Sequence, residues 1–232
     1  MTIMDDSVRA KYQHIFEILA ATYGFPTWRQ HLPPVDELVD TILSQNTSDV
    51  ARDKGFERLR QRFPSWEAVR DAPASEVIDA VRPAGMADTK GPRIQQVLRQ
   101  ITDERGAITL DFLAEMDVEA AKAWLTRFNG VGPKTAAIVL LFAFNKPAFP
   151  VDTHVHRVTQ RLGLIGAKTT REQAHVELEK IIPPDQYYQA HLNFIEHGRK
   201  ICRAARPLCQ RCPLTTLCDY YQNIKSKDGR HV

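Results

Sequence analysis

The sequence has no cysteine before residue 202, no long apolar run and no recognisable export segment. Its longest apolar run, residues 136–144, is about half the length of a membrane-spanning helix. The opening residues MTIMDDSVRA lack the positive charge, apolar stretch and small-residue cleavage site of an export signal. We therefore expect a cytoplasmic protein without a membrane partner. In that compartment structural disulfides are rare and clustered cysteines more often bind metal.

Alternation with the period of a β-strand is also absent, whereas apolar residues recur with the helical period along most of the chain. Ser65, Asp117 and Asp152 each precede such a pattern and are expected N-caps. Thr169 opens another expected helix, with Glu172 at capping-box spacing. Beyond residue 202 the spacing becomes irregular, as expected where metal holds the chain. We predict an all-α fold without repeats or low-complexity linkers.

All four cysteines lie within seventeen residues, in the pattern C-x6-C-x2-C-x5-C formed by Cys202, Cys209, Cys212 and Cys218. Four thiolates at this spacing can surround one metal centre, and the two-residue gap is typical of a chelating turn. The number of ligands does not separate iron-sulfur from zinc. Two disulfides are the least favoured interpretation in a cytosolic protein.

The basic residues are concentrated in the same segment. The whole chain has a formal charge of only +3, but residues 190–232 hold eight Lys and Arg against three Asp and Glu, a local +5. Several arginines, among them Arg203 and Arg206, lie between the cysteines and exceed the charge that one thiolate centre requires. We expect some of them to contact an external anion such as a phosphate backbone.

A second motif is FNGVGPKTAAIVLLF at residues 128–142. Gly130 and Gly132 allow a tight turn between two helices and expose backbone N–H groups that can hold a phosphate. The P-loop pattern G-x-x-x-x-G-K-[ST] is not satisfied, so a nucleotide-binding loop is excluded. A plain helix connection with a solvated lysine is the alternative.

Lys134 lies in the first turn of the second helix, where the helix dipole disfavours an ammonium and apolar neighbours desolvate it. Both effects favour a neutral amine, which can act as a nucleophile and form a Schiff base. Asp152, in PVDTHVHRV, could accept a proton from Lys134 or stabilise positive charge on a sugar. His154 and His156 fit no common metal motif and are expected to pack.

The motifs G-V-G-x-K-T-A, V-D-T-H-V-x-R-V and C-x6-C-x2-C-x5-C resemble, in order and spacing, those of the endonuclease III family of helix-hairpin-helix DNA glycosylases. The resemblance runs from about Val35 to Cys218. It implies a two-lobed fold, with a six-helix lobe at 28–146 and an iron-sulfur lobe at 1–27 and 147–232. It also implies a [4Fe-4S] cluster on the four cysteines, and so favours iron over zinc.

The activity that the resemblance implies is base excision repair of double-stranded DNA with a damaged base, by a monomer. Lys134 would release an oxidised pyrimidine and cleave the abasic strand by β-elimination, with Asp152 as its carboxylate partner. Gln45 and Asn46 resemble the segment that fills the gap left by a flipped base, and Met86 resembles the apolar wedge opposite. In a bacterium or archaeon the enzyme would be cytoplasmic and nucleoid-associated.

Three departures from the family pattern bear on the lesion. Asn129 stands where a Pro is usual, Ala87 follows Met86 where a Tyr is common, and Asn46 is one methylene shorter than the usual Gln. The turn depends on its glycines and tolerates the first change. The other two leave the lesion and the preferred opposite base open.

Two other functions compete with this interpretation. A monofunctional mismatch or other-lesion glycosylase is one, but adenine-specific relatives carry a catalytic Glu where this chain has Thr41, beside Asp40, and they lack the hairpin lysine. A non-catalytic DNA-binding protein is the other, but docking requires neither Lys134 nor Asp152.

Overall fold

The computed structural model describes residues 3–228, and its chain forms two compact units. The continuous unit is Arg29–Lys146, and the discontinuous unit combines Met1–Trp28 with Pro147–Val232. The described residues are helices and connecting loops without a β-strand, which confirms the predicted all-α fold.

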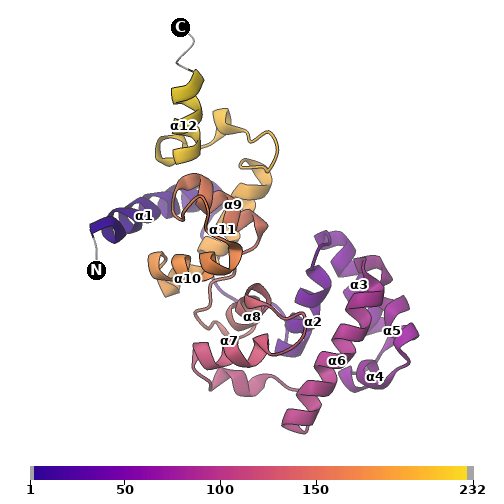
Figure 1. The fold of residues 1–232 in the computed structure, drawn as a ribbon. Coiled ribbons are helices and arrows are strands. Elements are labelled where there is room, and N and C mark those ends of the chain that lie inside the picture. Colours follow the sequence, from indigo (N-terminus) through magenta and orange to yellow (C-terminus); the bar gives the residue numbers. More distant parts are fainter. Residues whose placement is uncertain (1–2, 229–232) are drawn as a thin grey trace. The chain divides into compact units, whose positions relative to one another are not determined.

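The continuous unit contains a set of mostly short helices, of which α6 is the longest and packs against α4 and α5 (Figure 1). Their bounds are α2 Pro34–Ser44, α3 Asp49–Arg62, α4 Trp66–Asp71, α5 Ala74–Val81, α6 Ala87–Arg105, α7 Val118–Thr126 and α8 Pro133–Ile138. The 3₁₀ turns η1 Arg82–Ala84 and η2 Asp111–Ala114 lie between helices, and the π turn η3 Val139–Ala143 directly follows α8.

Local sequence explains several of these boundaries. The side chains of Ser65 and Asp117 accept hydrogen bonds from backbone N–H groups three residues ahead, so both predicted N-caps are confirmed. Helix α6 is followed by its C-cap Gly106, which has a φ of 76°. Glycine adopts this left-handed conformation without strain. Its apolar stripe, including Ile94, Leu98 and Ile101, is buried in the core of the unit.

The discontinuous unit is built around α11, which packs against two other helices. Its helices are α1 Ile3–Tyr23, α9 Thr153–Leu162, α10 Arg171–Ile181, α11 Tyr187–Lys200 and α12 Asp219–Asp228. Helix α11 packs against both α1 and α9, and Figure 1 shows α12 following the loop that carries the cysteines. That loop contains only 3₁₀ turns, η5 Cys209–Arg211 and η6 Thr215–Leu217, and a further turn, η4 Pro184–Gln186, precedes α11.

One predicted cap is displaced by a residue. Thr170, rather than Thr169, is the N-cap of α10 and forms a reciprocal capping box with Gln173. The sequence offers the same Thr and acid-or-amide spacing in two adjacent registers. The hydroxyl of Thr169 is used elsewhere, because it donates to the carboxylate of Glu177. Helix α12, in the segment with irregular spacing, was not expected from the periodicity.

Among residues 3–228, no helix combines the length and the apolar character needed to cross a membrane.

Candidate functional site

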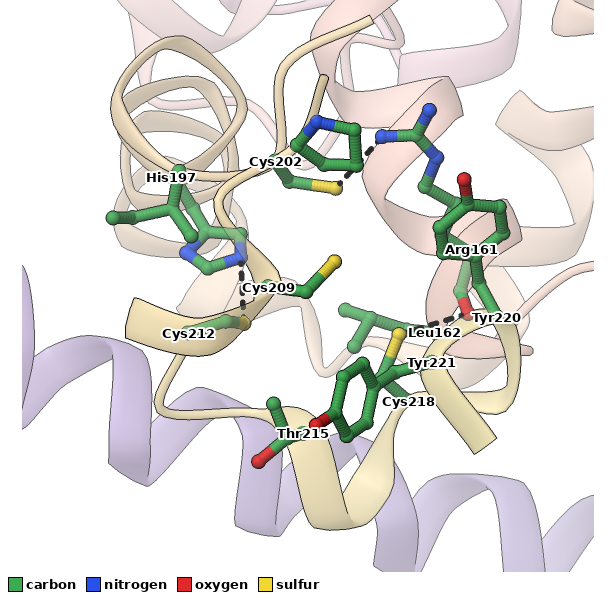
Figure 2. A pocket seen from close by; sticks show the side chains of 12 residues that line it. Arg161, Leu162, His197, Cys202, Cys209, Cys212, Thr215, Cys218, Tyr220 and Tyr221 are labelled. Atoms are coloured by element: carbon green, nitrogen blue, oxygen red, sulfur yellow. Dashed lines mark hydrogen bonds between the residues drawn. The ribbon is translucent and has the colours of Figure 1, made fainter. Parts of the chain in front are cut away.

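The four cysteines lie around one pocket of the discontinuous unit, together with Arg161 of α9 and His197 of α11 (Figure 2). Cys218 is buried and the other three are half-buried. No two of these thiols are joined in a disulfide. The spacing in the sequence therefore corresponds to a common location in the fold.

Two side chains from neighbouring helices contact the thiols directly. A guanidinium N–H of Arg161 donates to Cys202 Sγ at 3.4 Å, and His197 Nε2 lies 3.7 Å from Cys212 Sγ. The thiol of Cys218 donates to the backbone carbonyl of Arg161 at 3.4 Å. The motif analysis did not identify either helix residue, because neither belongs to the cysteine pattern.

Burial dominates the electrostatics of this pocket. It raises the pKa of Cys212 to about 11 and raises the pKa of Cys218 as well, because an apolar surrounding disfavours a thiolate. It also lowers the pKa of His197 to about 4, so this imidazole is neutral at pH 7. Its Nδ1 lies 3.0 Å from the hydroxyl of Tyr23. Thiols in such a setting become thiolates when a metal centre supplies positive charge.

The donor set of the pocket fits an iron-sulfur cluster. Four cysteine thiols line one cavity, and the guanidinium of Arg161 lies beside it to offset thiolate charge. In the described part of the chain, no group of three or more His, Cys, Asp or Glu side chains is arranged around a single ion position.

The loop between the first two cysteines is basic, and a side chain of α9 holds its backbone. Arg203 and Arg206 are exposed, and Arg206 has a left-handed φ of 52°. The guanidinium of Arg161 donates to the carbonyls of Arg203 at 2.7 Å and Ala204 at 3.0 Å. The same arginine thus contacts a cysteine ligand candidate and the loop that carries the exposed charges.

The hairpin of the continuous unit has one glycine that its conformation requires and one that it does not. Gly130 has a φ of 81°, and a Cβ at this position would overlap the side chain of Arg93. Gly132 is extended, with a φ of −92°, and a Cβ there would meet open space. Both glycines lead into α8, in which Lys134 is the second residue and is half-buried.

Asp152 is the N-cap of α9, as the sequence predicts. Its Oδ1 accepts a hydrogen bond from the backbone N–H of Val155 at 2.7 Å, and the side chain is half-buried. His156 Nε2 donates a hydrogen bond to the carbonyl of Thr169 at 2.8 Å, in agreement with the structural role expected for this residue. Lys134 belongs to the continuous unit and Asp152 to the discontinuous one, so their catalytic pairing stays a prediction.

The predicted DNA-probing residues converge within the continuous unit. Asn46, just after α2, and Met86, just before α6, lie with Asn46 Nδ2 and Met86 Sδ 3.9 Å apart. Both side chains are exposed and both residues have left-handed backbones, with φ values of 52° and 50°. Gln45 instead is turned toward the hairpin, where its Nε2 donates to the carbonyl of Gly130 at 2.9 Å.

Residues 39–184 match the family model described as "HhH-GPD superfamily base excision DNA repair protein". The chain is 33% identical to "Endonuclease III" of Thermotoga maritima over 198 residues, which cover 85% of this chain and 88% of the relative. It is also 33% identical to "Endonuclease III" of Sulfolobus acidocaldarius, over 82% of this chain and 83% of the relative.

A solved structure described as a non-covalent Endonuclease III–DNA complex resembles the chain with a TM-score of 0.81 and 26% identity. The alignment covers 94% of this chain and 98% of the other. A thymine-DNA glycosylase structure has a TM-score of 0.77, but at 21% identity this likeness concerns the fold alone.

Proposed function

Because the chain belongs to the HhH-GPD superfamily of base excision DNA repair proteins and is an endonuclease III-like DNA glycosylase, we propose that it is bifunctional. In this proposal it removes oxidised pyrimidines from double-stranded DNA and then cleaves the abasic strand. The observation that carries the proposal is Lys134, the second residue of the helix that follows the glycine hairpin. One relative, 30% identical over 67% of this chain and 12% of its own length, is named "DNA glycosylase/AP lyase ROS1" from Arabidopsis thaliana.

The proposed reaction begins at the amine of Lys134. The neutral amine attacks C1′ of the damaged nucleotide, and the glycosidic bond breaks as the base leaves. The C1′–O4′ bond then breaks, O4′ takes up a proton, and the opened sugar is joined to Lys134 at C1′ as a protonated Schiff base. Loss of a C2′ proton and departure of the 3′ phosphate then break the strand by β-elimination, and water finally releases the enzyme.

Asp152 is the proposed partner of the lysine. With Oδ1 accepting the N–H of Val155, its carboxylate is held in one orientation at the start of α9. A carboxylate so fixed is suited to take a proton from the attacking amine or to stabilise the positive charge that develops on the sugar.

The remaining predicted residues are proposed to bind the duplex. Backbone N–H groups near Gly130 and Gly132 would hold a phosphate, and the exposed Arg203 and Arg206 would add sequence-independent attraction. The exposed side chains of Asn46 and Met86 lie next to each other and would enter the base stack of the DNA at the lesion. Such a protein would act as a monomer.

Cys202, Cys209, Cys212 and Cys218 are the proposed ligands of a [4Fe-4S] cluster. When bound, the cluster would supply a rigid four-point cross-link for a segment that otherwise has only 3₁₀ turns. Arg161 would hold the basic loop against this cross-link through its contacts to Arg203 and Ala204.

The test is a product analysis on a duplex that contains a single thymine glycol. We expect strand cleavage without alkali treatment by the wild type. Lys134→Ala should lose this cleavage by at least about a hundredfold, since the nucleophile is absent. Lys122→Ala, which removes a half-buried lysine of α7, is the matched control and should cleave like the wild type.

Other results would overturn the proposal. Cleavage that appears only after alkali treatment would identify a monofunctional glycosylase. A protein that binds the duplex but releases neither thymine glycol nor any other oxidised or mismatched base would be a non-catalytic DNA-binding protein.

A further inference from the structure

We propose that Lys90 and Arg93 of α6 are positioning residues that hold the three DNA-probing segments of the continuous unit in one fixed arrangement. These segments are the plug loop (Gln45–Asn46), the wedge loop (Gly85–Met86) and the hairpin (Gly130–Gly132). The inference rests on the proposed function, because it concerns the same DNA-binding surface. It gives roles to two residues that had none in the sequence analysis.

Lys90 ties the plug loop to the wedge loop. Its side chain is only 1% exposed, and its Nζ donates to the carbonyl of Leu43 at 2.7 Å and to that of Ala84 at 2.8 Å. Leu43 lies in the last turn of α2, and Ala84 is the last residue of η1. Carbonyls at helix ends lack intrahelical partners and carry partial negative charge, so one ammonium stabilises both ends.

The buried ammonium of Lys90 is costly and depends on its two hydrogen bonds. Desolvation lowers the pKa of Lys90, and the positive charge of Arg93 acts in the same direction. Within residues 3–228, its Nζ donates to these two backbone carbonyls and to no carboxylate. A buried cation is costly unless its hydrogen bonds are well formed. Because both bonds must be kept, the backbone at Leu43 and the backbone at Ala84 are held at a defined separation.

The tips that follow these two carbonyls are conformationally strained. Asn46 comes three residues after Leu43, and Met86 comes two residues after Ala84; both have φ near 50°. Left-handed conformations at non-glycine residues persist only where the surroundings fix them. The approach of Ala84 to Gly55 of α3, where a Cβ would lie 2.9 Å from the Ala84 Cβ, fixes the wedge loop from its other side.

Arg93, one turn further along α6, connects the plug loop to the hairpin. Its Nη1 donates to Oε1 of Gln45 at 3.0 Å, and Nε2 of the same amide donates to the carbonyl of Gly130 at 2.9 Å. The Arg93 side chain also occupies the space that a Cβ of Gly130 would need. Gln45 is therefore a link between protein segments, and Asn46 is the side chain of the pair that remains exposed.

The consequence for DNA recognition is preorganisation. If the tips and the hairpin are held together before DNA arrives, binding to a lesion does not have to order them. Loss of Lys90 or Arg93 should weaken recognition of a lesion, where both tips enter the stack. It should affect binding to undamaged duplex much less, because phosphate contacts dominate there.

The test measures discrimination, the ratio of the dissociation constants for undamaged duplex and for a duplex with one tetrahydrofuran abasic analogue. Lys90→Met and Arg93→Ala should each lower this ratio by about tenfold, through the damaged duplex. The matched controls remove an exposed lysine of α3, Lys54→Met, and an exposed arginine of α6, Arg99→Ala. Both should leave the ratio unchanged. Helicity and melting temperature are measured for every variant.

A double-mutant cycle separates positioning from a general effect on stability. In a background with Asn46→Ala and Met86→Ala, Lys90→Met should lower discrimination by less than about twofold, since the residues through which it acts are gone. An additive loss in that background would overturn the inference. If Lys90→Met is not recovered folded, Arg93→Ala decides, because its side chain is only half-buried.

Failure of the inference differs from failure of the proposed function. A wild type without preference for the abasic analogue would overturn both. The positioning roles alone would be overturned by three results together. The wild type discriminates, the Asn46→Ala, Met86→Ala double variant does not, and Lys90→Met and Arg93→Ala each discriminate like the wild type.

Discussion

Asp152 illustrates how one side chain serves both local structure and proposed chemistry. Its Oδ1 caps α9 through the N–H of Val155, a role that requires an acceptor but no charge. The proposed catalytic role requires the negative charge. Asparagine keeps the acceptor and removes the charge, so a single substitution separates the two.

Asp152→Asn should therefore melt within about 2 °C of the wild type, because asparagine and aspartate are comparable N-caps. Its rate of base release should fall by about a hundredfold or more. Asp117→Asn is the matched control, since Asp117 caps α7 with the same geometry, at 3.0 Å from the N–H of Ala120. Single-turnover kinetics measure the rates; a stable variant with the wild-type rate would remove Asp152 from the chemistry.

Sequence reasoning identified those residues whose contacts lie close to them along the chain. Asp152 and Asp117 were predicted as caps because each contacts a backbone group three residues away. Lys90 also contacts a group 47 residues away and Arg161 a group 41 residues away, and the sequence analysis gave neither residue a role. Long-range polar contacts became visible only in the fold.

Among the elements, the hairpin before α8 shows that two glycines in one motif are not equivalent. At Gly130 the positive φ would strain a residue with a Cβ, and the side chain of Arg93 would have to move to make room for it, whereas Gly132 is extended and faces open space. The motif predicted the turn but did not distinguish the two positions, because the difference comes partly from Arg93 of another helix.

Gly130→Ala should lower the free energy of unfolding by about 1 kcal/mol or more, through left-handed strain and overlap with Arg93. It should also weaken binding to undamaged duplex, because the hairpin backbone would shift. Gly132→Ala should retain wild-type stability. Urea denaturation compares the two, and equal losses would contradict the distinction.

Element boundaries were predictable where the capping pattern occurred once. Ser65 and Asp117 begin their helices where expected. The start of α10 was displaced by one residue, because Thr169 and Thr170 offer alternative registers that tertiary contacts resolve. The amphipathic signal of α12 is weak, and its existence could not be inferred from periodicity beside the cysteines.

For the molecule as a whole, the small net charge conceals a segregated distribution. The exposed Arg203 and Arg206 lie in the loop between the first two cysteines, and Arg161 holds that loop through two backbone carbonyls. The sequence located this basic segment from residue counts alone. How the loop is supported required α9, which is distant in the sequence.

Charge reversal in this loop should change the salt dependence of DNA binding. The Arg203→Glu, Arg206→Glu double variant should flatten the slope of log affinity against log salt by about 2, one for each lost phosphate contact. Arg171→Glu, an exposed arginine of α10 in the same unit, is the control. An unchanged slope in the double variant, measured by fluorescence anisotropy, would remove the loop from the DNA interface.

Borohydride trapping on abasic duplex DNA tests whether the amine of Lys134 forms a covalent bond with C1′. Hydride from borohydride reduces the imine to a stable amine, and peptide mapping locates the modified residue. We expect one adduct, on Lys134, that is absent from Lys134→Ala and retained in Lys122→Ala. An adduct of wild-type yield in Lys134→Ala, or on another residue, would contradict it.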